Sequence, residues 1–237
     1  MAAPSQWVPG RRWASAAVPG APQGAETLSS GRIAQIMQQD FVDPGVYTRD
    51  RIFLDFGHPT SNVGWKLHVI KPPNLGRSIS ESHLPDNYMR LLRYLRVKQI
   101  PHKIVANLNG LAVMERNSGQ VGKFITIYPN DSEQLRRVAD IIEAFVPDNV
   151  NIAANPLAPE DLPVGARGLI GARWGGLTSE FSVNQTGNVI PDDRAAGPRP
   201  DWVRNPFNPR SVGVDGWVQF NDQQKAEIAV LRNRRRR

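Results

Sequence analysis

The segment that most constrains the fold spans residues 64–70, GWKLHVI, where apolar and polar side chains alternate without interruption. A two-residue period is typical of a β-strand with two different faces. The tryptophan, the leucine and the valine would point to one face, and Lys66 and His68 to the other. The pattern therefore predicts a sheet with one apolar face and one face that carries titratable side chains.

Several other segments show similarly clear periods. Strands are predicted at 102–106, 122–128 and 167–173. Helices are predicted at 29–41, at 84–96, after Asp131 with Gln134 in the capping-box position, and from Asn221 or Asp222 onward. Strands and helices interleave without a regular βαβ repeat. We therefore expect an α+β fold with a mixed or antiparallel sheet flanked by helices.

The ends of the chain differ from its centre. Residues 1–30 are rich in Ala, Pro, Gly and Ser and show no sustained period, so they predict a flexible arm. Residues 31–210 are expected to form the folded domain. Residues 211–237 would add a C-terminal helix and an arginine-rich tail, which we interpret as a solvated arm.

Several classes of protein lack support in this sequence. It has no cysteine, which excludes disulfide scaffolds, thiolate zinc sites and cysteine nucleophiles. The glycine-rich nucleotide-binding motifs, HExxH and GxSxG are also missing, and the four histidines show no metal-ligand spacing. No apolar run approaches the roughly 20 residues that span a membrane, and the first residues lack a secretory h-region. A cytoplasmic protein that does not bind membranes is expected.

The formal net charge of +7, from 29 Lys and Arg against 22 Asp and Glu, indicates an anionic partner. Five arginines among residues 232–237 contribute much of it. The other notable cations lie on or near the expected strands: Lys66, Lys103, Arg116, Lys123, Arg167 and Arg173. A single strand lysine is usually solvated, but neighbouring cationic strands would require a compensating anion such as phosphate. Nucleic acid is not the expected partner, because no aromatic stacking platform accompanies these cations.

Five segments, in their order along the chain, resemble the N-terminal lyase domain of class III lanthionine synthetases. They are GWKLHV, HKIV, GKFITIYP, ARWGG and IPDDR followed by RPDWVRNPF, and together they span roughly residues 50–210. The stand-alone lyases of class V lanthipeptide pathways are similar, and the phosphothreonine lyase effectors of bacteria are more distantly similar. The resemblance implies a phosphothreonine-lyase-like fold, in an isolated lyase domain or a stand-alone lyase.

The resemblance also implies an activity: β-elimination of phosphate from phosphoserine or phosphothreonine in a ribosomally made precursor peptide, without a metal or cofactor. It implies Lys103 as the base, His68 as the acid and Lys66 as the residue that tunes His68. Arg116, Lys123 and Arg173 would bind the phosphate, with Arg167 as a fourth ligand. The products would be dehydroalanine or dehydrobutyrine, and a separate or fused kinase and cyclase would act on the same peptide.

Three alternatives stay open at this point. Lys98 competes with Lys103 as the base, since both lie near the second predicted strand. Residues 154–157 read ANPL and lack the arginine that relatives often have before the last strand, a role that Arg167 would take over. The protein could also be a non-catalytic module that binds a phosphopeptide or a leader peptide.

Overall fold

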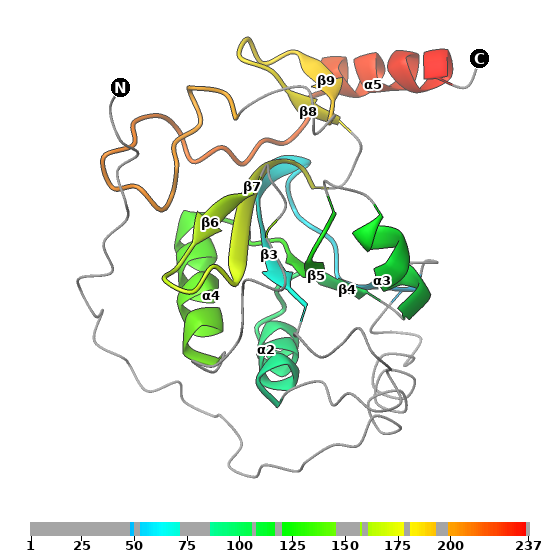
Figure 1. Ribbon diagram of the computed structural model, residues 1–237. Helices are drawn as coiled ribbons and strands as arrows, with labels where there is room; N and C mark the ends of the chain where they lie inside the picture. The colour runs from blue at the N-terminus through cyan, green and yellow to red at the C-terminus, as the bar shows by residue number, and fades with distance from the viewer. Residues whose placement is uncertain are drawn as a thin grey trace.

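The structure is a computed structural model of the chain. It describes residues 48–49, 53–71, 86–105, 108–116, 120–145, 157, 161–177, 181–192 and 199–235. The flexible arm expected at 1–30 and the helix expected at 29–41 lie outside the described residues. The described part is α+β, as predicted, with an antiparallel sheet and flanking helices (Figure 1).

The main sheet has seven strands in the order β1-β2-β4-β5-β3-β7-β6, and all neighbours are antiparallel. The strands are β1 (Thr48–Arg49), β2 (Phe53–Phe56), β3 (Val63–Ile70), β4 (His102–Val105), β5 (Lys123–Ile127), β6 (Leu162–Val164) and β7 (Ile170–Gly176). A separate two-stranded sheet consists of β8 (Phe181–Val183) and β9 (Val189–Pro191). The antiparallel alternative of the sequence prediction is therefore the correct one.

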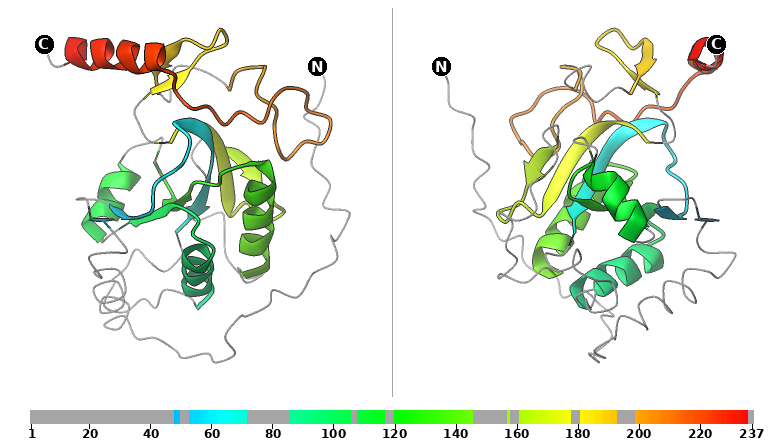
Figure 2. Two further views of the ribbon diagram at one scale, coloured as in Figure 1. Left: turned by 180° about the vertical axis from the view of Figure 1, so that it is seen from behind. Right: turned by 45° about the vertical axis from the view of Figure 1, so that its right-hand side comes forward.

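Four helices complete the described elements: α2 (Asp86–Val97), α3 (Leu108–Glu115), α4 (Ser132–Phe145) and α5 (Asp222–Arg235). Helices α2 and α4 pack against each other, and α4 contacts β3. The short sheet β8–β9 and helix α5 lie together at one end of the molecule, near the top of Figure 1 and of both views in Figure 2. This arrangement places a second, smaller layer beside the end of β3 and β7.

The apolar face of the central strands forms the core, as the alternation of residues 64–70 predicts. Leu67, Val69, Ile125 and Ile127 are fully buried there. The helices contribute stripes at helical spacing, with Leu91, Leu92 and Leu95 from α2 and Leu135, Val138 and Ile142 from α4. The opposite face of β3, which carries Lys66 and His68, is also covered, because all eight residues of β3 are buried.

The helix ends follow the predicted capping. The Asp131 carboxylate accepts a hydrogen bond from the backbone N–H of Gln134 at 2.7 Å. The side-chain oxygen Oε1 of Gln134 accepts one from the backbone N–H of Asn130 at 2.8 Å. Asn221 caps α5 in the same way, through the Gln224 amide at 2.8 Å. Helix α5 extends to Arg235, so most arginines of the expected tail belong to a helix.

The strand predicted at 167–173 begins three residues later, at Ile170. Residues 165–168 form the turn between β6 and β7, where Gly165 and Gly168 adopt positive φ angles of 80° and 64°. Only glycine adopts this backbone region without strain, which ends the alternating pattern before β7. The two-residue period therefore does not connect Arg167 to Arg173.

Candidate functional site

One face of the sheet carries a row of polar residues from four neighbouring strands, three of them titratable. In the register of the sheet, Asp55 on β2 is opposite Lys103 on β4, Lys103 is opposite Thr126 on β5, and Thr126 is opposite His68 on β3. Directly opposed residues of antiparallel strands point to the same face. Since strands lie about 4.8 Å apart, the backbones of Lys103 and His68 are separated by roughly 10 Å. The small side chain of Thr126 lies between them.

Lys66 and Arg173 form a second opposed pair on the same face, two residues along β3 from His68. Both are buried, at 6% and 8% exposure. Lys66 Nζ donates to the carbonyl oxygen of Gly176 at 2.6 Å and lies 3.8 Å from Asp192 Oδ2. Arg173 Nη2 lies 3.4 Å from Asp192 Oδ1. The sequence alone indicates no role for Asp192, which follows β9 in the IPDDR segment.

Lys123 reaches this face through an irregularity of the sheet. The register between β3 and β5 shifts by one residue after Val69, so that Ile70 is opposite Lys123 rather than Phe124. If the alternation continued without a bulge, Lys123 would point to the core face, as Ile125 does. A β-bulge re-aims a side chain in this way and is frequent beside functional sites. Lys123 Nζ consequently lies 3.3 Å from Asp161 Oδ1.

Asp161 also holds His68, since His68 Nδ1 and Asp161 Oδ2 are 2.6 Å apart. Asp161 precedes β6 and has a fully buried side chain. Gly171, opposite His68 on β7, leaves the space for it: a Cβ atom there would lie 2.7 Å from the Asp161 Cβ. Sequence analysis missed Asp161, because its place in a Pro-rich loop gave no signal of its neighbours.

Burial and the neighbouring charges together decide the protonation of His68 and Asp161. Burial lowers the pKa of His68 to about 3; Asp161 opposes this shift, while Lys123 and Lys66 reinforce it. For Asp161, burial opposes ionisation, but His68 and Lys123 outweigh burial and hold the pKa of the carboxyl below its usual range. At neutral pH Asp161 is therefore a carboxylate and His68 a neutral imidazole. The Nδ1–H group of His68 donates to Asp161, which leaves Nε2 as an acceptor.

Lys103 lies at the other end of the row and is only partly buried. Its Nζ is 4.0 Å from the centroid of the Phe53 ring, a cation–π contact. Lys98, the competing candidate, lies in an exposed turn after α2, before Pro101 and outside any strand. Of these two lysines, the register connects only Lys103 to the row that contains His68.

The two remaining predicted phosphate ligands are Arg116 and Arg167. Arg116 is exposed, just past the end of α3, where the preceding Glu115 pairs with Lys71 after β3. Arg167 lies in the β6–β7 turn, and its Nε is 4.0 Å from Glu143 Oε2 on α4. The predicted strand at 167–173 would place Arg167 and Arg173 on one face, but this prediction is wrong for Arg167, because β7 begins only at Ile170.

The cluster of Lys66, His68, Lys123 and Arg173 is less cationic than the sequence suggested. Its three cations are accompanied by the carboxylates of Asp161 and Asp192. The sequence argument, that crowded cations require an external anion, therefore needs correction: internal carboxylates already provide much of the compensation. Within the described ranges, no group of three or more His, Asp or Glu residues could hold a metal ion.

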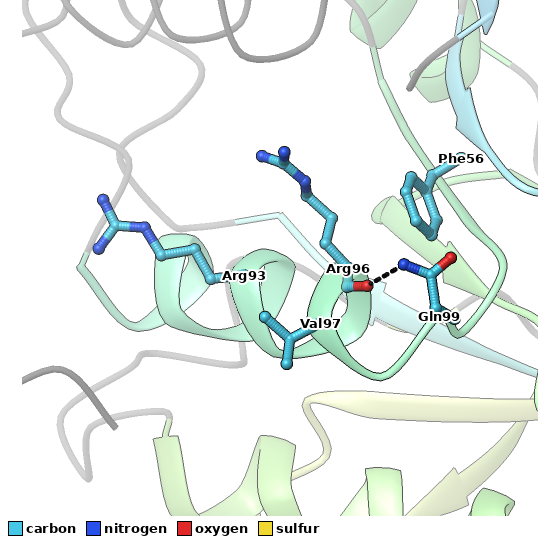
Figure 3. Close-up of a pocket in the computed structure, with 5 residues that line it drawn as sticks. All are labelled: Phe56, Arg93, Arg96, Val97 and Gln99. Atoms are coloured by element: carbon cyan, nitrogen blue, oxygen red, sulfur yellow. Dashed lines mark hydrogen bonds between the residues drawn. The ribbon is translucent and has the colours of Figure 1, made fainter. Parts of the chain in front are cut away.

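A pocket of about 290 Å³ lies elsewhere, at the end of α2 (Figure 3). Phe56, Arg93, Arg96, Val97 and Gln99 line it. The Gln99 side chain donates a hydrogen bond to the Arg96 carbonyl oxygen at 3.0 Å, beside the Phe56 ring. None of the cluster residues lines this pocket, so it is a feature separate from the candidate site.

The fold and the cluster together describe an α+β protein whose central antiparallel strands carry buried cations paired with carboxylates. Residues 52–213 match the family model of the RamC N-terminal domain, which covers more than half of the chain. The chain belongs to this family, whose members act in lanthipeptide biosynthesis. A search of curated proteins gives no match. In the described part of the chain, no helix is both long and apolar enough to cross a membrane.

Proposed function

We propose that this protein removes phosphate by β-elimination from phosphoserine or phosphothreonine residues of a precursor peptide, to give dehydroalanine or dehydrobutyrine. The observation that carries the proposal is the row formed by Lys103, Thr126 and His68, adjoining the pair of Lys66 and Arg173 on one sheet face. A base and an acid about two strand spacings apart can act on the two ends of one Cα–Cβ–O unit. Membership in a lanthipeptide-biosynthesis family is consistent with this chemistry.

The elimination needs one base and one acid. Lys103 Nζ, as the neutral amine, takes the Cα proton, and the electron pair of the C–H bond forms the Cα=Cβ double bond. The Cβ–O bond breaks, and the phosphate leaves with its electron pair. His68 Nε2 gives a proton to the departing oxygen. No atom is oxidised or reduced by an external reagent, so the step balances without a cofactor.

The cations around His68 supply the electrostatic part of the mechanism. Arg173 and Lys123 bind the phosphate oxygens, Arg173 through its planar guanidinium. Lys66 lies opposite Arg173 and two residues from His68, where it interacts with both the phosphate and the carbonyl next to Cα. Arg116 completes the phosphate site from the end of α3. Arg167 is not part of this proposed phosphate site, since it lies in the turn before β7, beside Glu143 of α4, and not on the strand that carries Arg173.

His68 must gain a proton before it can act as an acid, because burial keeps its imidazole neutral in the free protein. A phosphate dianion at the cluster favours the imidazolium, as any nearby negative charge does. Asp161 fixes the ring through Nδ1 and so directs Nε2 toward the leaving group. In this mechanism, the substrate itself brings His68 into its acidic form.

The first experiment follows the mass of a peptide that carries phosphoserine or phosphothreonine. With wild-type protein, we expect loss of phosphoric acid from the peptide. Lys103→Ala should slow elimination by roughly 10²–10⁴-fold while peptide binding persists, because only the base is removed. Lys98→Ala, the matched control, should react like the wild type. Activity in Lys103→Ala but not in Lys98→Ala would overturn the assignment of the base. Binding with unchanged mass would instead support a non-catalytic phosphopeptide-binding module.

The wider pathway is also part of the proposal. A lyase of this kind acts after a kinase that phosphorylates serine or threonine and before a cyclase that adds thiols to the new double bonds. In this proposal the thiols come from cysteines of the substrate peptide, and this chain itself contributes none. The kinase and the cyclase of the same pathway would be separate proteins or domains fused to this one.

A further inference from the structure

Asp192 lies at the position where the proposed substrate phosphate would bind. It directly follows β9 of the small sheet and faces Lys66 and Arg173 of the main sheet. Its two oxygens lie 3.8 Å from Lys66 Nζ and 3.4 Å from Arg173 Nη2. Strong charge-assisted N–H···O bonds are about 2.7–2.9 Å long, so both contacts are long. The carboxylate is therefore held mainly by charge and not by short hydrogen bonds.

Arg173 keeps hydrogen-bonding capacity that Asp192 does not use. Its side chain is 9% exposed, and its Nη1 atom is buried without a hydrogen-bond partner among the described residues. A buried donor without an acceptor is costly, and native structures contain few of them. A guanidinium offers five donors in a planar fork that matches the oxygens of phosphate. Arg173 is thus suited to a ligand with more acceptors than the single carboxylate supplies.

The charges of the cluster argue that Asp192 and a phosphate cannot share this position. Asp161 is already committed to His68 and Lys123. A phosphate dianion beside Lys66 and Arg173 would lie within a few ångströms of the Asp192 carboxylate, where like charges repel strongly in a buried site. Displacement of Asp192 removes this repulsion and frees both cations for the phosphate.

We infer that Asp192 occupies the anion position of the free protein, and that the substrate phosphate displaces its carboxylate. The inference rests on the proposed function for the identity of the ligand. It also makes Asp192 a residue that determines specificity. An acidic side chain of a peptide carries one charge, as Asp192 does, and competes poorly with a carboxylate tethered beside the site. A phosphate group carries up to two charges and three acceptor oxygens, so it can displace the Asp192 carboxylate from the two cations.

The test compares wild-type protein with Asp192→Asn by calorimetric titration at pH 7.5, with inorganic phosphate and acetate as probes. Asp192→Asn removes the competing charge at nearly constant size. We expect it to bind phosphate at least about tenfold more tightly than the wild type, and to bind acetate measurably where the wild type does not. Asp201→Asn is the matched control, since Asp201 is exposed and lies outside the cluster. It should bind both probes as the wild type does.

Weaker phosphate binding by Asp192→Asn would overturn the inference, because it would mean that Asp192 organises Lys66 and Arg173 for the ligand. Unchanged binding would overturn it as well. A second measurement does not depend on a variant: phosphate added to wild-type protein should shift the ¹³C carboxylate resonance of Asp192. A resonance that stays in place while phosphate binds would contradict displacement.

The test of the Asp192 exchange can fail or succeed independently of the test of the proposed lyase activity. If wild-type protein binds phosphate and Asp192→Asn binds it more tightly, but no phosphopeptide loses phosphoric acid, the lyase proposal fails and the exchange stands. If elimination occurs but Asp192→Asn binds phosphate no more tightly, the exchange alone fails.

Discussion

Lys66 and His68 are unusual because they are titratable residues on a strand that is buried along its whole length. An isolated charge in such a place would cost several kcal/mol of solvation free energy. Each of the two has a specific partner instead: Lys66 donates to the Gly176 carbonyl oxygen, and His68 is bonded to Asp161. Groups that are buried at such cost and still kept close together are typical of functional sites.

The neutral state of His68 leads to a prediction about protons. The free protein holds the pKa of His68 at about 3, while a bound phosphate dianion raises it. Phosphopeptide binding at pH 7 should therefore be coupled to proton uptake. Calorimetric titration of Lys103→Ala, which avoids turnover, in buffers of different ionisation enthalpy measures this uptake.

The control carries His68→Asn in the same Lys103→Ala background, so that protons released by the phosphate itself cancel between the two proteins. The protein with His68 should take up more protons than the control. Equal uptake in both would mean that His68 stays neutral in the complex and cannot be the acid of the elimination.

At the scale of single elements, β7 supports the site through the absence of a side chain. Gly171 is opposite His68, and an added Cβ would lie 2.7 Å from the Asp161 Cβ and 2.8 Å from Asp161 Oδ2. Separations under about 3 Å force one of the groups to move. Gly171 has the backbone conformation of an ordinary strand residue, so a side chain at this position would not strain the backbone. An added Cβ would conflict only with the atoms of Asp161.

We therefore expect Gly171→Ala to displace Asp161 and to lower kcat for elimination by about 10–100-fold, the usual effect of losing a group that orients a catalytic side chain. Steady-state kinetics with a phosphopeptide measure this loss. The neighbouring Ala172→Gly is the control: residue 172 points to the core face, so the change should lower stability but spare kcat. A Gly171→Ala protein with wild-type kcat would show that the position of Asp161 is not important for the reaction.

Elements with a clear period could be predicted from sequence, and elements defined by tertiary contacts could not. The strands β3, β4 and β5 and the helices α2, α4 and α5 all follow alternating or helical patterns and were predicted. The short strands β6, β8 and β9 lie in Pro- and Gly-rich segments with little periodicity, and the sequence analysis missed them.

The site, too, could be predicted from sequence only as far as local periodicity allows. Periodicity placed Lys66 and His68 on one strand face, but it cannot give the order of strands in a sheet or their register. The bulge that turns Lys123 toward Asp161 is a property of the pairing between β3 and β5. Asp161 and Asp192 reach the cluster from segments 93 and 126 residues away from His68 and Lys66, and no local pattern indicates such pairings.

At the scale of the whole molecule, buried histidines couple folding to pH. His102 resembles His68 in this respect: burial lowers its pKa to about 4, while its Nδ1 lies 2.8 Å from the Ile100 carbonyl oxygen and its ring stacks on Phe56. Both histidines ionise near 6.5 when exposed in the unfolded chain. The unfolded state therefore binds more protons than the folded state below pH 6.5, and stability must fall as the pH drops through that range.

Each histidine should cost about 1.4 kcal/mol of stability per pH unit once the pH is well below 6.5. The two together should lower the free energy of unfolding by about 3 kcal/mol between pH 7.5 and 5.5. The contribution of Asp161 is lost only below about pH 4, because its folded pKa lies under the usual value of 3.8. Urea denaturation at several pH values measures this dependence.

Variants separate the two contributions. His102→Gln should remove about half of the loss between pH 7.5 and 5.5, since it leaves only His68 to titrate in this range. His58→Gln is the control, because His58 is exposed in the folded chain. The free energy of unfolding of this variant should depend on pH as that of the wild type does. A free energy of unfolding that stays constant from pH 7.5 to 5.5 in the wild type would mean that both histidines also ionise near 6.5 in the folded protein, and that burial does not keep them neutral. A free energy of unfolding that rises as the pH falls would mean that the folded protein already holds these protons at pH 7.5. His68 would then be an imidazolium before any substrate binds, and the proton needed for the leaving phosphate would already be in place.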